Sequence, residues 1–131
     1  MQAAILSDLL PHLAADNARR RSIAGRYASS LRGGLALPPA CEGGDVAHLY
    51  VVRVPAGREG LRRHLEKNGV GSEVHYPGPD HRQPVFGAGF AHVRLPVTER
   101  LAAEVLTLPC YPEMADEEVG KVIDAVNGWP S

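Results

Sequence analysis

The strongest constraint on the fold is an amphipathic stretch that fills the first 31 residues of the chain. Its apolar side chains recur at helical spacing, which predicts a long helix with one apolar stripe: Leu6, Leu10, Leu13, Ala24, Tyr27 and Leu31. Pro11 lacks a backbone N–H and crowds the preceding turn, so we expect a kink or break there. Gly33-Gly34 predicts the end of the helix. A stripe of this length must cover other apolar surface.

After a predicted loop at residues 35–47, the pattern indicates a strand–helix–strand unit. Residues 48–54 (HLYVVRV) are rich in β-branched and aromatic residues and predict a strand. Residues 58–68 predict a short helix that buries Leu61 and Leu65 and ends at Gly69. Residues 72–76 (SEVHY) predict a second strand.

The carboxyl-terminal part adds two helices and a third strand. We expect a helix at residues 97–106, a short strand at Thr107-Leu108, and a final helix at residues 116–127 with Val119, Val122, Ile123 and Val126 on one face. The chain is therefore predicted to be one α/β (α+β) domain over residues 1–131. Its expected architecture is a small three-stranded sheet with helices packed on one face, preceded by a long N-terminal helix.

The charge balance argues against nucleic acid as a partner. Lysine and arginine number 14 and aspartate and glutamate number 15, for a net charge of −1, whereas nucleic-acid binders usually carry a basic surplus. The one basic run, Arg19-Arg20-Arg21, would fan out over different faces of a helix. We interpret it as helix surface.

The number of cysteines and the length of the apolar runs indicate the cellular compartment of the protein. Cys41 and Cys110 are too few for a disulfide framework and lack zinc spacing, which favours a reducing compartment. We expect Cys110 to be a small buried side chain, because no base lies beside it in the sequence. No apolar run reaches the ~18–20 residues that span a bilayer. We expect a cytoplasmic protein without membrane contact.

The candidate site lies where the second predicted strand enters a loop. Residues 77–96 hold seven of the 25 glycines and prolines, so this segment cannot be regular for long. His75, Tyr76 and His81 lie at its start, where side chains can converge on a ligand. His75 alternates with Glu73, so both share one face. The alternative is that these are surface residues bonded to nearby backbone. The spacing lacks a third metal ligand, so no metal site is expected.

The chain has only two lysines that could form a Schiff base. Lys67 and Lys121 both fall on predicted helices among polar neighbours. A lysine that forms a Schiff base needs a desolvated or electropositive pocket, and neither position offers one.

Several segments resemble one family. The most specific are GVGSEVHYPGPDHRQPVF (69–86) and LPVTERLAAEVLTLPCYPEMADEEV (95–119), with HLYVVRV (48–54) between them and the first helix. They are similar, in the same order, to the carboxyl-terminal third of the pyridoxal phosphate (PLP)-dependent sugar-nucleotide aminotransferases of the DegT/StrS group. The resemblance implies the small domain of a fold type I PLP enzyme. Residues 1–33 would be the helix that links it to an absent cofactor domain, and residues 34–131 the small α/β domain.

The resemblance also implies a function and a set of site residues. The intact enzyme would move an amino group from an amino acid such as glutamate to a keto-sugar nucleotide, with PLP as cofactor. His75, Tyr76, His81 and Gln83 would face the substrate. The catalytic lysine and the cofactor-binding residues belong to the absent part, so we expect no catalytic residue and no bound cofactor in this chain alone.

Two alternatives use the same residues differently. The chain could be a freestanding interaction module whose helix at residues 1–31 dimerises or docks on a complete aminotransferase. It could also be a small independent enzyme built on His75 and His81, although neither a nucleophile nor a metal shell accompanies them.

Overall fold

The computed structural model describes residues 2–130, so Met1 and Ser131, which the predicted domain includes, lie outside the described residues. The chain begins with α1 (Gln2–Leu9), the 3₁₀ turn η1 (Leu10–His12) and the long helix α2 (Leu13–Ser30). The break expected at Pro11 is confirmed, because the proline stands at the start of η1. The end expected before Gly33-Gly34 is confirmed as well, since both glycines have positive φ.

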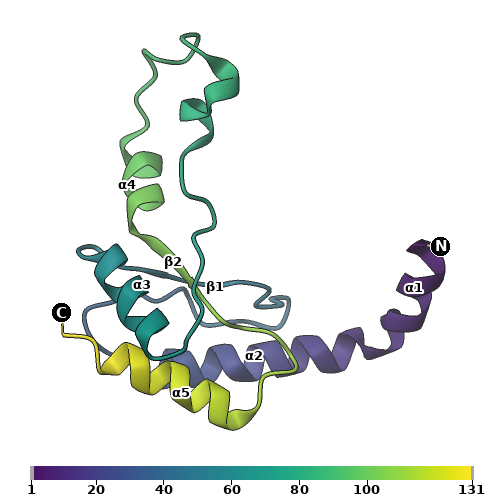
Figure 1. Cartoon of the computed structure of the whole chain (residues 1–131). Helices are drawn as coiled ribbons and strands as arrows, with labels where there is room; N and C mark the ends of the chain where they lie inside the picture. Colours follow the sequence, from purple (N-terminus) through teal and green to yellow (C-terminus); the bar gives the residue numbers. More distant parts are fainter. Residues whose placement is uncertain (1, 131) are drawn as a thin grey trace.

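The sheet consists of two antiparallel strands. In β1 (Tyr50–Arg53) and β2 (Val105–Leu108), Tyr50 pairs with Leu108 and Arg53 pairs with Val105. The strands lie at the centre of the molecule (Figure 1). At the end of the ladder, Arg53 donates two hydrogen bonds of 3.0 and 2.7 Å to Glu104 Oε2.

The predicted third strand at residues 72–76 is wrong. This segment touches the sheet at one point, where the backbones of Glu73 and Thr107 exchange hydrogen bonds of 3.1 and 2.7 Å. Pro77 follows at once and has no N–H to continue a ladder, so the chain leaves the sheet. The boundary predicted between the helix at 97–106 and the next strand is also wrong: α4 (Pro96–Glu104) ends earlier, and β2 begins at Val105.

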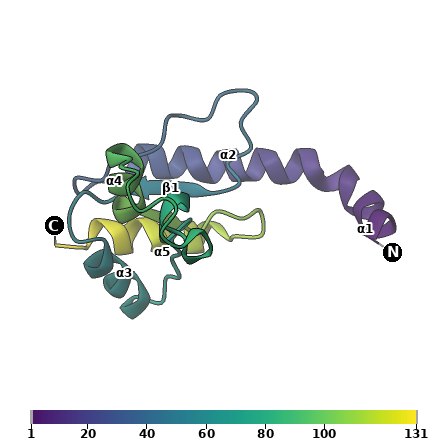
Figure 2. The same ribbon diagram turned by 90° about the horizontal axis from the view of Figure 1, so that it is seen from above.

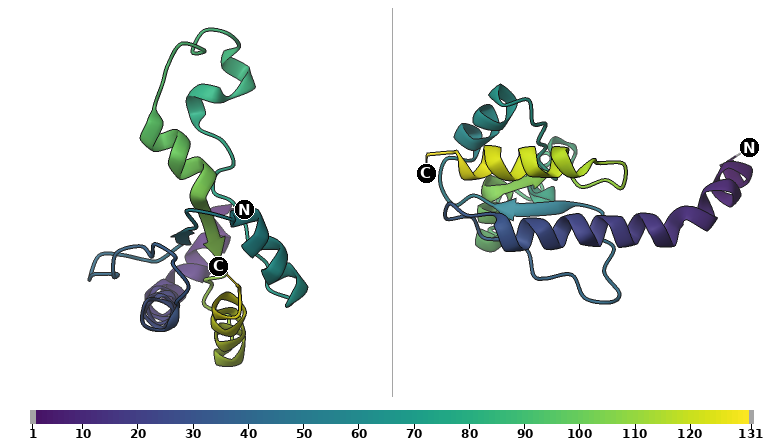
Figure 3. Two further views of the ribbon diagram at one scale, coloured as in Figure 1. Left: turned by 90° about the vertical axis from the view of Figure 1, so that its left-hand side faces the viewer. Right: turned by 90° about the horizontal axis from the view of Figure 1, so that it is seen from below.

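Three helices lie on the same side of the strands. Figure 3 shows α2, α3 (Arg58–Lys67) and α5 (Asp116–Asn127) gathered there. The predicted helices at 58–68 and 116–127 are thus confirmed to within one residue. Their apolar faces meet β1 and β2 in one core, whose fully buried side chains are Ile23, Tyr27, Val52, Val54, Leu61, Leu65, Leu106, Leu108 and Val119.

Arginines join α2 to the start of α5. Arg19 and Arg26 each lie 2.9 Å from Asp116 Oδ1, and the hydrogen bond and charge of Arg19, followed by Arg26, hold the pKa of Asp116 below its usual value. Arg21 instead donates to the Asp45 carbonyl at 3.2 Å. The basic run therefore fans out over different faces, as predicted.

A projecting segment, residues 77–95, is called the arm here. It contains the 3₁₀ turns η2 (Asp80–Arg82) and η3 (Pro84–Phe86) and returns to the sheet through α4. Figure 1 shows the arm and α4 extending from the sheet, away from α2 and α5. The arm thus places polar side chains at a distance from the core.

The apolar stripe predicted on the first helix divides in two. Ala24, Tyr27 and Leu31 are buried in the core, whereas Leu6, Leu10 and Leu13 of the predicted stripe are exposed, together with the neighbouring Ile5 and Leu9. Figure 2 shows α1 projecting away from the other elements. In the described part of the chain, no helix is both long and apolar enough to cross a membrane.

Candidate functional site

One groove brings together three of the four predicted site residues. His75, Tyr76 and His81 line a groove of about 480 Å³ between the base of the arm and α4. The α4 side contributes Thr98, Leu101 and Ala102. Gln83 is exposed and lies outside the residues that line this groove. The groove therefore combines imidazole and phenol groups with an apolar wall.

The ring of His75 is fixed by β2. Its Nδ1 lies 2.9 Å from Oγ1 of Thr107, a residue only 6% exposed. His75 also borders a second groove of about 430 Å³, which Glu73 lines as well. Ser72, next to Glu73 in the chain, lines this groove too, so the predicted shared face of Glu73 and His75 stays a prediction. Because Thr107 is buried in the sheet, it holds the imidazole at the boundary between the two grooves.

Tyr76 is the most open of these side chains. It is 72% exposed, and its ring lies edge-on to that of His75, with centroids 5.5 Å apart. An exposed phenol beside a fixed imidazole leaves an apolar ring face and a hydroxyl free to contact a ligand.

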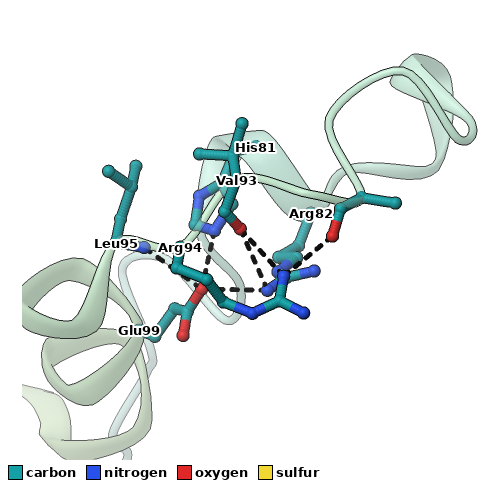
Figure 4. A network of polar contacts seen from close by, with 7 residues as sticks. His81, Arg82, Val93, Arg94, Leu95 and Glu99 are labelled. Atoms are coloured by element: carbon teal, nitrogen blue, oxygen red, sulfur yellow. Dashed lines mark hydrogen bonds and ion pairs between the residues drawn. The ribbon is translucent and has the colours of Figure 1, made fainter.

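His81 is held by a carboxylate on α4. Its Nε2 lies 2.9 Å from Glu99 Oε1, and Arg82 Nη2 lies 3.0 Å from the same oxygen (Figure 4). The hydrogen bonds of His81 and then Arg82 lower the pKa of Glu99 to about 2. An ionised carboxylate only accepts hydrogen bonds, so His81 Nε2 is the donor.

Sequence reasoning missed the two residues that fix these histidines. Thr107 was part of the predicted strand, and its hydroxyl carried no signal of its own. Glu99 offered a weak signal, because an acidic residue just after Pro96 fits the first turn of a helix. Its pairing with His81, 18 residues away, is a tertiary contact that spacing does not reveal.

The buried cysteine and the two lysines lie outside the groove between the arm and α4. Cys110 is buried as predicted: its Sγ lies 3.5 Å from the Ala47 carbonyl oxygen, and burial raises the pKa of the thiol. Lys67 is exposed on α3, and Lys121 donates to the Gly69 carbonyl at 3.1 Å from an exposed position. Among residues 2–130, no cluster of three or more metal-ligating side chains is found.

Comparison with protein families decides the relationship. The model of the DegT/DnrJ/EryC1/StrS aminotransferase family matches residues 1–127. The chain belongs to this family. The DegT/DnrJ/EryC1/StrS aminotransferases depend on PLP, and the resemblance seen in the sequence is confirmed.

Two curated relatives of this chain are named for nucleotide-sugar substrates. The chain is 40% identical to the UDP-N-acetyl-3-dehydro-α-D-glucosamine 3-aminotransferase of Acidithiobacillus ferrooxidans, covering 96% of this chain and 34% of the relative. It is also 40% identical to the dTDP-3-amino-3,4,6-trideoxy-α-D-glucose transaminase of Streptomyces venezuelae, covering 98% and 35%. The chain thus spans about one third of the length of these relatives.

Solved structures of family members share the fold. DesV from S. venezuelae, determined with a ketimine intermediate, superposes with a TM-score of 0.85 at 37% identity, over 98% of this chain and 36% of that one. NtdA from Bacillus subtilis, with bound PMP, gives a TM-score of 0.78 at 30% identity, over 87% and 28%. Since the DesV match includes nearly the whole chain, it extends to the projecting helix and the arm.

Proposed function

We propose that this chain forms the sugar-facing wall of a PLP-dependent aminotransferase that moves an amino group from an amino acid, such as glutamate, to a keto-sugar nucleotide. The observation that carries the proposal is the groove between the arm and α4, where His75 and His81 are each held by a dedicated partner. Membership of a family with curated relatives that are named for 3-dehydro and 3-amino nucleotide sugars supports it.

The groove suits a sugar. Imidazole nitrogens donate to or accept from hydroxyl groups, and His75 and His81 are oriented before any ligand arrives, which lowers the entropic cost of binding. Tyr76 adds an exposed ring that can cover an apolar face of a sugar. These residues would bind and orient the sugar, and Gln83, exposed on the arm, would contact more distant parts of the substrate.

The lysines of this chain do not fit a cofactor bound as a Schiff base. Such a lysine must lose its proton, which requires burial or a nearby cation. Lys67 is exposed, and Lys121 lies in a groove whose lining includes the acidic Glu117 and Asp124. We therefore assign the binding of the cofactor to residues outside this chain.

The exposed part of the apolar stripe is proposed as the partner surface. Leu6, Leu9 and Leu10 on α1 and η1 are each more than half exposed, and apolar side chains gathered in this way mark interaction sites. We propose that they pack against the cofactor-bearing domain, with residues 1–33 as the link and 34–131 as the small domain, or against a second subunit.

The freestanding-module alternative is not favoured, since the match to complete enzymes covers nearly the whole chain. A cytoplasmic location, without contact to nucleic acid, stays a prediction.

A chimera tests the proposal. This chain would replace the matching third of the S. venezuelae transaminase, and the two half-reactions, with amino donor and with keto-sugar nucleotide, would be measured separately. The chimera should aminate the sugar nucleotide. His75→Ala and His81→Ala should each lower kcat/KM for the sugar by about tenfold or more, the value of one hydrogen bond of 1.4 kcal/mol. The donor half-reaction should keep its rate.

His92→Ala provides the matched control, because His92 is an exposed histidine of the arm that does not line the groove. It should leave both half-reactions unchanged. Equal losses in the two half-reactions of the His75 and His81 variants would show that these residues do not face the sugar.

A further inference from the structure

We propose that Glu99 is a positioning residue, a clasp that ties both limbs of the arm to α4 and keeps the ring proton of His81 on Nε2. The consequence for a ligand rests on the proposed function of the groove. The clasp itself rests on the contacts of Glu99 alone.

Three donors from different parts of the arm converge on one oxygen of Glu99. Two donors lie where the chain enters the arm: His81 Nε2 at 2.9 Å and Arg82 Nη2 at 3.0 Å. The third lies where the chain returns to α4: the backbone N–H of Leu95 at 3.4 Å. Figure 4 shows all three around the carboxylate. One side chain of α4 therefore closes the base of the arm.

The rest of the arm is tied only to itself. Arg82 Nη2 donates to the Val93 carbonyl across the base at 3.3 Å, and Arg94 donates to the Ala91 carbonyl at 2.8 Å. Backbone hydrogen bonds such as Phe86 N to Gln83 O are local turns. Within the described residues, the hydrogen bonds of residues 83–94 all stay inside the arm. The polar attachment to α4 therefore comes from Glu99, through its carboxylate and through its backbone N–H, which donates to the Leu95 carbonyl at 2.9 Å.

The clasp also sets the chemistry that His81 offers. A carboxylate accepts but does not donate, so Nε2 carries the proton, and Nδ1 of the neutral ring is left as an acceptor. The His81 side chain is only 7% exposed, so its ring cannot turn freely to exchange the two nitrogens. In the groove, neutral His81 would thus accept a hydrogen bond from a donor such as a sugar hydroxyl, and Thr107 holds His75 separately.

NMR of the ligand-free chain tests the clasp directly. Long-range ¹H–¹⁵N spectra at about pH 9, well above the ordinary histidine pKa of about 6.5, report the tautomer of His81. The wild type should show the Nε2–H form, with backbone order parameters near 0.85 at residues 80–82 and 93–95. Glu99→Ala should mix the tautomers and lower these order parameters below about 0.6, while β1 and β2 stay rigid.

The control is Arg100→Ala on the next residue of α4, since Arg100 is 59% exposed and lies 3.9 Å from Glu104, away from the arm. It should match the wild type. If Glu99→Ala does not fold, Glu99→Gln replaces it, and partial loosening of residues 80–82 and 93–95 is then expected. An Nδ1–H form in the wild type, or unchanged tautomer and order parameters in the Glu99 variant, would overturn the proposal. Because no sugar is added, failure of the proposed function would leave these results untouched.

Discussion

Thr107 of β2 holds His75 in two ways. Its hydroxyl lies 2.9 Å from His75 Nδ1, and its backbone exchanges two hydrogen bonds with Glu73, two residues before the histidine. The bridge that joins residues 72–76 to the sheet and the imidazole of the groove therefore depend on the same residue. A part of the site that extends beyond the sheet is thereby fixed to the core.

Thr107→Val should separate these two effects, because valine keeps the shape and the backbone of threonine but removes the hydroxyl. We expect a loss of about 0.5–1.5 kcal/mol in the free energy of unfolding, the usual net value of one hydrogen bond, measured by urea denaturation. The His75 ring should become mobile while the Glu73 amide stays protected from exchange. The control is Thr98→Val on the exposed surface of α4, which should change stability by less than about 0.5 kcal/mol. Equal effects of the two substitutions would contradict a special role for Thr107.

Acid should weaken the contacts between Glu99 and the arm, at a pH set by the pKa of the Glu99 carboxyl. The pKa of Glu99 is lowered from 4.5 to about 2 in the folded chain, mainly by the hydrogen bond from His81, so the folded state favours the ionised carboxylate. The resulting stabilisation is fully present above pH 4.5 and is lost as the pH falls through about 2. The stability difference between wild type and Glu99→Gln should therefore shrink as the pH falls from 4.5 towards 2. A difference that grows on acidification would contradict the lowered pKa.

The helices could be predicted because their signals are local. In α3, Leu61 and Leu65 recur at helical spacing and Gly69 follows with a φ of +65°, so the pattern and the stop chemistry agree. In α5, Val119, Val122 and Val126 form one apolar face, and all three are buried. The position of Pro11 was sufficient to place the break in the first helix.

The third strand and the clasp could not be predicted, for different reasons. Residues 72–76 have the composition of a strand, but whether Glu73 makes one bridge or a full ladder depends on where the chain goes after Pro77, which is a tertiary property. The partnership of His81 with Glu99 joins two residues across an irregular segment that no periodicity describes. The family resemblance identified the histidines, but their partners emerged only from the structure.

Two neighbouring tyrosines should respond differently to loss of the hydroxyl. Tyr27 and Tyr50 are both buried, with ring centroids 5.0 Å apart, and burial raises the pKa of each, that of Tyr50 to about 12. The Tyr27 hydroxyl donates to the Pro109 carbonyl at 2.8 Å, whereas the Tyr50 hydroxyl has no hydrogen-bond partner among residues 2–130. Tyr27→Phe should cost about 1 kcal/mol in unfolding free energy, and Tyr50→Phe should cost less or stabilise. Denaturation of both variants measures the difference, and a greater loss for Tyr50→Phe would refute the assignment.

Buried and exposed apolar side chains of α1 and α2 should differ in what their truncation does. Ile23 on α2 is fully buried, so Ile23→Ala removes packed methyl groups and should lower the stability of the chain by about 2–4 kcal/mol. Leu9 on α1 is 56% exposed, and Leu9→Ala should change the stability of the isolated chain by less than about 0.5 kcal/mol. In the chimera with the S. venezuelae transaminase, however, Leu9→Ala should lower the melting temperature, because the surrounding enzyme would then bury that side chain. Ser7→Ala, an exposed change on the same helix, serves as the control. If Leu9→Ala does not lower the melting temperature of the chimera either, the exposed apolar surface of α1 is not a partner surface. If Leu9→Ala lowers the stability of the isolated chain, α1 already packs against the rest of that chain.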